Sequence, residues 1–183
     1  TPLPLGRDAA RWALLHPAPH DRPRITAEHL SQREGNPLFR VRYAHARTRA
    51  LLRNAADLGF TPDPGPVTGA VTHAAPGPRT ATPGNGPKPA PEVGEAGSAT
   101  LLAPLADHPR ILLAAATHRT PDRLARHLVT VADALMPLLP TVLPLGAEKP
   151  SAAHRARLAL AEAAGTVLAG GLSLLGIDAP DHL

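Results

Sequence analysis

One segment, residues 36–59, has the periodicity of a long amphipathic helix and limits what this chain can fold into. At about 100° per residue, its apolar side chains fall on one broad sector of a helix. That sector holds Val41, Ala44, Thr48, Leu51, Leu52, Ala55 and Leu58. A line of four residues lies on roughly the opposite side: Arg42, Ala46, Arg49 and Arg53. We expect the first face to be buried and the second to meet solvent or an anion.

The ends of this helix are marked by residue type. Asn36 is a preferred N-cap residue, and Pro37 follows it at a position where a missing N–H costs nothing. Gly59 stands where a left-handed residue ends many helices. By charge alone, the arginines are explained equally well by a solvated helix face and by an anion-binding face.

Composition favours helices in the rest of the chain as well. Hydrophobic residues make up 43% of the sequence but aromatic residues only 2%, so the core must consist of Leu, Ala and Val. Ala and Leu favour helix over sheet, and we expect no strands. Helices are predicted at 101–105, 109–117, 122–135 and 152–175. Thr120 and Ser151 are the expected N-caps of the last two.

A Pro- and Gly-rich stretch interrupts this helical pattern. Residues 61–99 contain nine Pro and seven Gly, a density that cannot sustain a helix or a sheet. We expect a long disordered insert that tethers two helices. A proline-rich ligand for a partner domain is the alternative interpretation.

The sequence argues against several classes of function. It has no Cys, so it has no disulfide, no catalytic thiolate and no cysteine-ligated zinc. Its 10 His show no His-x-x-x-His pair beside a Glu, and we predict no metal and no cofactor; His45 is expected to be a structural histidine. No run of 18 apolar residues and no secretory leader is present, so we expect a cytoplasmic protein without membrane contact. A formal charge of +4 permits an anionic partner.

The amino-acid sequence of this predicted helix resembles a motif of a known family. Residues 36–47 spell Asn-Pro-x-Phe-x-Val-x-Tyr-Ala-His-Ala-Arg, which is similar to the first helix of the DALR anticodon-binding domain of arginyl-tRNA synthetases. Residues 118–128, 155–163 and 171–180 resemble the middle, the last helix and the C-terminal tail of that domain. Residues 6–15 resemble the end of the catalytic domain that precedes it.

This resemblance implies an all-α, DALR-type helical bundle at 36–183, interrupted by the insert at 61–99 and preceded by a helical lead-in at 1–35. It also implies a module that binds tRNA, with arginine tRNA as one candidate. The RNA-binding residues that we predict are Arg40, Arg42, Tyr43, Ala46, Arg47, Arg49, Arg53, Arg155 and Arg157. The family's catalytic motifs, His-Ile-Gly-His and a Lys-Met-Ser-Lys-like loop, do not occur, so we expect no aminoacylation by this chain alone.

The chain departs from the family in one region. Aromatic residues that the family places near the anticodon bases are replaced by His127, Leu138 and Leu139. Three prolines in 135–145 should end a helix near Met136 and leave an apolar segment. A second interpretation is therefore a paralogue that docks this segment on a protein, such as a separate synthetase. A third is the C-terminal piece of an arginine-tRNA ligase whose catalytic half is separate.

Overall fold

The protein is an all-α bundle, as the sequence predicts. The computed structural model describes residues 5–67 and 93–183, and these residues contain no strand. The helices are α1 (Gly6–Leu15), α2 (Pro37–Asp57), α3 (Val93–His118), α4 (Pro121–Leu135) and α5 (Ala152–Leu174), with two short 3-10 turns, η1 (Ala27–Leu30) and η2 (Leu139–Thr141). None of the helices described is long and apolar enough to cross a lipid bilayer.

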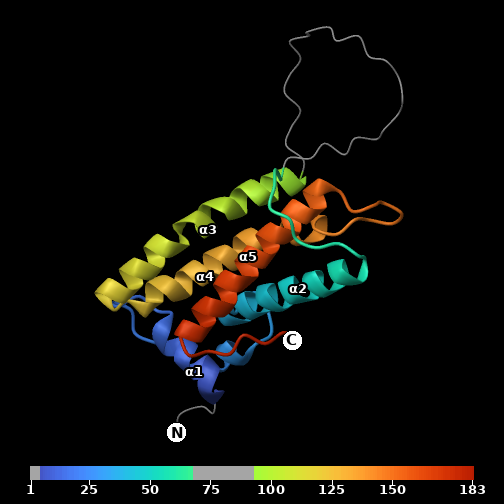
Figure 1. Ribbon diagram of the computed structural model, residues 1–183. Coiled ribbons are helices and arrows are strands. Elements are labelled where there is room, and N and C mark those ends of the chain that lie inside the picture. The colour runs from blue at the N-terminus through green and yellow to red at the C-terminus, as the bar shows by residue number, and fades with distance from the viewer. Residues whose placement is uncertain (1–4, 68–92) are drawn as a thin grey trace, which may run out of the picture.

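The four long helices lie side by side around one apolar core. Figure 1 shows α3, α4 and α5 stacked across the bundle with α2 on the far side from α3, while α1 covers one end. Leu and Val side chains from α2, α4 and α5 fill the centre of the core, and Trp12 of α1 and Phe60 after α2 are also almost fully buried. After α5 the chain returns toward α2, so the C-terminus lies beside that helix.

The predicted ends of α2 are confirmed. The Asn36 side chain accepts a hydrogen bond from the Leu38 N–H at 3.1 Å. At the other end Gly59 has a φ of +76°, which an L side chain rarely adopts. The Gly59 N–H bonds to the Ala56 carbonyl and the Phe60 N–H to the Ala55 carbonyl, each at 3.0 Å. This pair of bonds is a Schellman motif, which satisfies carbonyls that the helix leaves free.

The third helix is longer than predicted, and two of our boundaries are wrong. We expected separate helices at 101–105 and 109–117 and a disordered insert up to residue 99, but α3 is continuous from Val93 to His118. Pro104 and Pro109 lie inside it and each removes one backbone bond. Packing against α4 and α5 holds the helix together across both positions.

The Gly-rich start of α3 is ordered because it packs closely against the rest of the bundle. A Cβ on Gly97 would lie 3.3 Å from the Leu138 backbone nitrogen, so glycine permits this approach. Ser98 is fully buried and donates to the Gly94 carbonyl at 2.7 Å. On the other side of the insert, the Asp63 N–H bonds to the Arg155 carbonyl at 3.2 Å. The part of the predicted insert at 68–92 lies outside the described residues.

The segment 135–145 is not a free docking surface, which corrects a second expectation. Helix α4 ends at Leu135, as the prolines predict, but the chain then turns through η2 and packs back on the core. Leu138 and Val142 are fully buried and Leu139 is 5% exposed. Their side chains form part of the hydrophobic core. Only Met136 and Leu145 of the large apolar residues in this segment are exposed.

Candidate nucleic-acid interface

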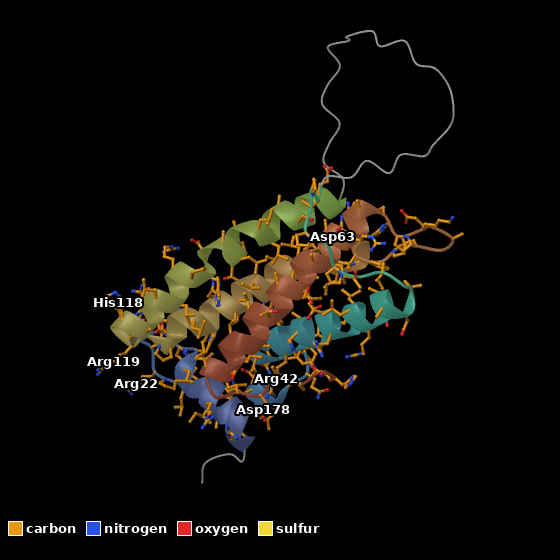
Figure 2. The ribbon with its side chains drawn as sticks, viewed as in Figure 1. Arg22, Arg42, Asp63, His118, Arg119 and Asp178 are labelled. Atoms are coloured by element: carbon orange, nitrogen blue, oxygen red, sulfur yellow. The ribbon has the colours of Figure 1, made fainter. Side chains whose placement is uncertain are left out.

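Two arginines of the line on α2 meet carboxylates, but these carboxylates belong to the chain itself. Arg42 forms an ion pair with the carboxylate of Asp8 on α1, and its Nε donates to the Asp178 carbonyl at 3.0 Å. Figure 2 shows Arg42 and Asp178 side by side at the base of the bundle. The Arg42 side chain is only 21% exposed. Ala46, which we placed on the solvent side, is buried, so that expectation is wrong.

The C-terminal tail covers the same line further along α2. Arg49 contacts the Asp181 carboxylate through Nε at 3.0 Å and Nη2 at 3.4 Å. Arg53 lies 3.5 Å from the His182 ring. His45 is buried and its Nδ1 bonds to the Pro180 carbonyl at 3.1 Å. His45 is therefore the satisfied structural histidine that the sequence predicts, although its partner is the tail and not a neighbouring helix.

A different face of α2 carries an open aromatic site. The rings of Phe39 and Tyr43 stack with centroids 5.6 Å apart and an interplanar angle of 23°. They line a cavity of about 790 Å³ that Glu34, Asp133 and Met136 also border. Residues four apart share a helix face, so both rings project toward the same opening.

One charged pair lies in the wall of this cavity. Arg40 Nη1 donates to both carboxylate oxygens of Asp133 on α4, at 2.9 and 3.0 Å. The side chains are 33% and 47% exposed, so water reaches the pair from the cavity side. The carboxylate orients the guanidinium of Arg40 beside the two rings.

The other predicted contacts are divided between exposed and buried positions. Arg47 is exposed and lies one helical turn after Tyr43. Arg155 is half-buried at the start of α5, and its carbonyl holds Asp63. Arg157 is 7% exposed and donates to the Thr141 carbonyl at 3.3 Å. It therefore braces the 135–145 segment, and our placement of it on an RNA-facing surface is wrong.

The structure does not bring the α5 arginines to the aromatic cavity. Tyr43 lies near the start of α2, and about 20 Å of helix separates it from Asp57 at the other end. The bond between Asp63 and Arg155 joins the start of α5 to the segment that follows that far end. Arg155 and Tyr43 consequently belong to different regions of the surface.

A pair of histidines stands where the family resemblance predicts a lost aromatic contact. The rings of His127 on α4 and His108 on α3 stack with centroids 5.2 Å apart. Burial lowers the pKa of both histidines, and His108 lowers that of His127 further. Both rings are thus favoured in the neutral form, as part of the α3–α4 contact. Within 5–67 and 93–183, no group of three or more His, Cys, Asp or Glu could hold a metal ion.

Comparison with known protein families identifies the family of this chain. A model of the DALR anticodon binding domain matches residues 41–183. The chain belongs to the DALR anticodon-binding domain family. The resemblance seen in residues 36–47 is confirmed.

A solved structure is similar to almost the whole DALR-family chain. Thermus thermophilus arginyl-tRNA synthetase has 26% sequence identity and a TM-score of 0.64 over 96% of this chain. The match covers 26% of the synthetase chain, so this protein spans about a quarter of that length.

Three parts of the candidate site were not predicted from the sequence. Phe39 lies four residues before Tyr43, and that spacing could have identified the stacked pair. Asp133 and Met136 carry no sequence signal that places them beside α2. Nor does the sequence indicate that the Asp178 carbonyl and the Asp181 carboxylate contact the predicted RNA-binding arginines.

Proposed function

We propose that this DALR-family chain is a tRNA-binding module that holds an unstacked base against Phe39 and Tyr43. The observation that carries the proposal is the stacked aromatic pair at the cavity beside α2. Single-stranded nucleotides bind proteins largely by stacking on such rings, at about 1–3 kcal/mol per base. The membership in the DALR family and the similarity to an arginyl-tRNA synthetase support tRNA as the nucleic acid.

The groups around the rings suit a nucleobase. The cavity of about 790 Å³ has room for a base and its ribose, and Met136 adds an exposed, adaptable apolar contact. Glu34 and Asp133 offer carboxylate oxygens that could accept a hydrogen bond from an exocyclic amine. Arg40 lies where its guanidinium can stack on a base or meet a phosphate.

The phosphate contacts of this proposal begin with Arg47. It is exposed and lies one turn from Tyr43, so it can reach a phosphate that flanks a bound base. Arg40, Arg42, Arg49 and Arg53 complete the basic surface on α2 in this proposal, and Arg155 is a separate contact at the start of α5. Ala46 and Arg157 support this surface from within the bundle. Phosphate contacts of this kind supply affinity and register, and base contacts supply preference among sequences.

We also propose that the module does not charge tRNA by itself. Residues 1–183 contain neither the His-Ile-Gly-His nor a Lys-Met-Ser-Lys-like motif of the synthetase catalytic domain. The proposed unit is residues 36–183, with 1–35 as a lead-in. Trp12 of that lead-in is 1% exposed and packs in the same core, which supports a single folded body.

Two substitutions of one side chain test the base-binding site. Binding of fluorescently labelled total tRNA is measured by anisotropy as salt is raised. Tyr43→Ala should weaken binding by about 1–3 kcal/mol with the salt slope unchanged, because a stacked ring releases no counterions. Tyr43→Phe keeps the ring and serves as the control, with an affinity close to wild type. Circular dichroism checks that the helix content is unchanged.

A matched pair of arginines tests the phosphate contact. Arg47→Gln should reduce the slope of log affinity against log salt by about one. Arg123→Gln removes an equal charge from an exposed position on α4 and should leave that slope unchanged. If wild-type protein binds no tRNA even at low salt, the proposed function is wrong.

A further inference from the structure

The C-terminal tail lies along α2 as an extended strap. Four consecutive turns of the helix contact it through Arg42, His45, Arg49 and Arg53. Their partners in the tail are the Asp178 carbonyl, the Pro180 carbonyl, the Asp181 carboxylate and the His182 ring. The tail thus contacts the arginine line that the sequence presents for nucleic acid, while Arg49 and Arg53 remain exposed to solvent.

The base of the strap is held in the bundle, and its last three residues are exposed. Gly176 has a φ of +69°, and its carbonyl accepts hydrogen bonds from Arg7 and Arg11 of α1. Ile177 is 2% exposed and belongs to the core. Ala179 is half-buried against the core, and Asp178 is held at its N–H by Asp8 and at its carbonyl by Arg42. Residues 181–183 are exposed, so they can lift from α2 without opening the core.

Asp181 resembles a bound phosphate in its contacts. Its two carboxylate oxygens accept from the Nε and Nη2 of Arg49, the fork that also recognises a phosphate. The hydrogen bond from Arg49 keeps the pKa of Asp181 below its ordinary value, so the carboxylate is ionised at neutral pH. Arg53 lies beside the same position, next to the His182 ring, and adds to its positive potential.

We propose that Arg49 and Arg53 form a phosphate-binding site for RNA, and that Asp181 occupies this site in the free protein. The tail and the phosphodiester backbone then compete for one set of donors. This inference rests on the proposed function, because it names a second contact of the same RNA and the step that exposes it.

The strength of the pair suits such an exchange. The side chains of Arg49 and Asp181 are 47% and 49% exposed, and exposed ion pairs are weak and are screened by salt. A nucleic acid supplies a phosphate for the same fork and also releases condensed counterions when it binds. The RNA therefore displaces the tail, and the tail lowers the affinity by a modest factor.

The test compares two aspartates that each form an exposed ion pair with an arginine. Asp181→Asn removes the anion from the site on α2. Asp107→Asn removes the same charge and an equivalent pair, with Arg110, on α3 at the other side of the bundle. With total tRNA at low salt, Asp181→Asn should bind about two- to fivefold more tightly than Asp107→Asn. The advantage of Asp181→Asn should shrink as salt is raised, because salt also screens the exposed ion pair that the RNA must break in the wild type.

A second substitution tests whether Arg49 is the group released. Arg49→Gln should cost more affinity in the Asp181→Asn background than in wild type, because wild-type Arg49 must first give up the carboxylate. Equal costs in the two backgrounds would show that Arg49 and Asp181 do not compete with RNA.

The movement of the tail has its own readout. The chain has no Cys, so Leu183→Cys gives a single site for a nitroxide label. Saturating tRNA should sharpen the spectrum of the label as the tail leaves α2, whereas unchanged or broader lines would overturn the inference.

The outcomes separate the inference from the proposed function. If no variant binds tRNA, both fail. If wild type binds and Asp181→Asn behaves like Asp107→Asn, the proposed function stands and the competition by the tail is wrong. Weaker binding by Asp181→Asn would make the tail part of the RNA site and would also overturn the inference.

Discussion

Two glycines of α5 provide a direct test of how closely α2 is held. Gly165 faces α2, where a Cβ would lie 2.6 Å from the Oγ1 and 3.2 Å from the Cβ of Thr48. Thr48 is 1% exposed and its hydroxyl donates to the His45 carbonyl at 2.7 Å, so the side chain has little room to move. Gly170, in the same helix, has nothing within 4 Å of such a Cβ.

The expected energies follow from these distances. Alanine in place of a glycine inside a helix gains about 1 kcal/mol from propensity, and both substitutions receive this gain. Gly165→Ala must also force α2 away from α5, and overpacking of this kind costs about 1–3 kcal/mol. The propensity gain cancels in the comparison, so Gly165→Ala should be about 1–3 kcal/mol less stable than Gly170→Ala.

The assay is thermal unfolding followed by circular dichroism. For a chain of this size, the difference corresponds to a Tm lower by about 2–12 °C for Gly165→Ala. Thr48→Ala removes the nearest atom, so Gly165→Ala should lower Tm less in a Thr48→Ala background than in wild type. The effect of Gly170→Ala on Tm should be the same in both backgrounds. A Tm for Gly165→Ala equal to or above that of Gly170→Ala would refute the close contact between the two helices.

Three further predictions concern stability. Burial lowers the pKa of His108 and His127 in the folded chain, so the unfolded chain binds protons first as pH falls below about 6.5. Tm should therefore decrease as pH is lowered from about 6.5 towards the pKa values of the folded chain, and it should decrease less steeply in His127→Leu. Ser151→Ala removes the side-chain cap of α5 and half of its capping box with His154. Urea unfolding should show a free energy of unfolding lower by about 1 kcal/mol, and an unchanged urea midpoint would contradict this prediction. Arg119 has a φ of +52° after α3, so Arg119→Gly should raise Tm slightly, and a lower Tm would mean that the arginine side chain stabilises this turn.

The sequence by itself determined the local structure of this protein. The spacing of Val41, Ala44 and Leu51 defined the buried face of α2, and all three are buried. Asn36 and Gly59 marked the ends of that helix, because capping depends on backbone groups within a few residues. The motif in 36–47 indicated the family for the same reason, since its residues share one short helix.

The tertiary structure decided what those local elements meet. Helix α3 continues through Pro104 and Pro109, against their intrinsic preference, because its neighbours bury one side of it. Leu138 and Val142 looked like a docking segment in sequence, yet they fill the core, since packing depends on residues far away in the chain. Sequence patterns report short-range preferences and carry no record of such partners.

The candidate site shows the same division. Phe39 and Tyr43 are neighbours by helical spacing alone, but Asp133 joins them only because α4 packs beside α2. The arginine line was correct as a line on one helix face, and its cover by the tail was not predictable. Asp181 lies 132 positions from Arg49 in sequence and reaches it because α5 directs the chain back to the side of α2. Charge and periodicity in the sequence identified the arginines of α2 as groups that bind anions. Only the folded chain determined that carboxylates of α1 and of the tail are their partners.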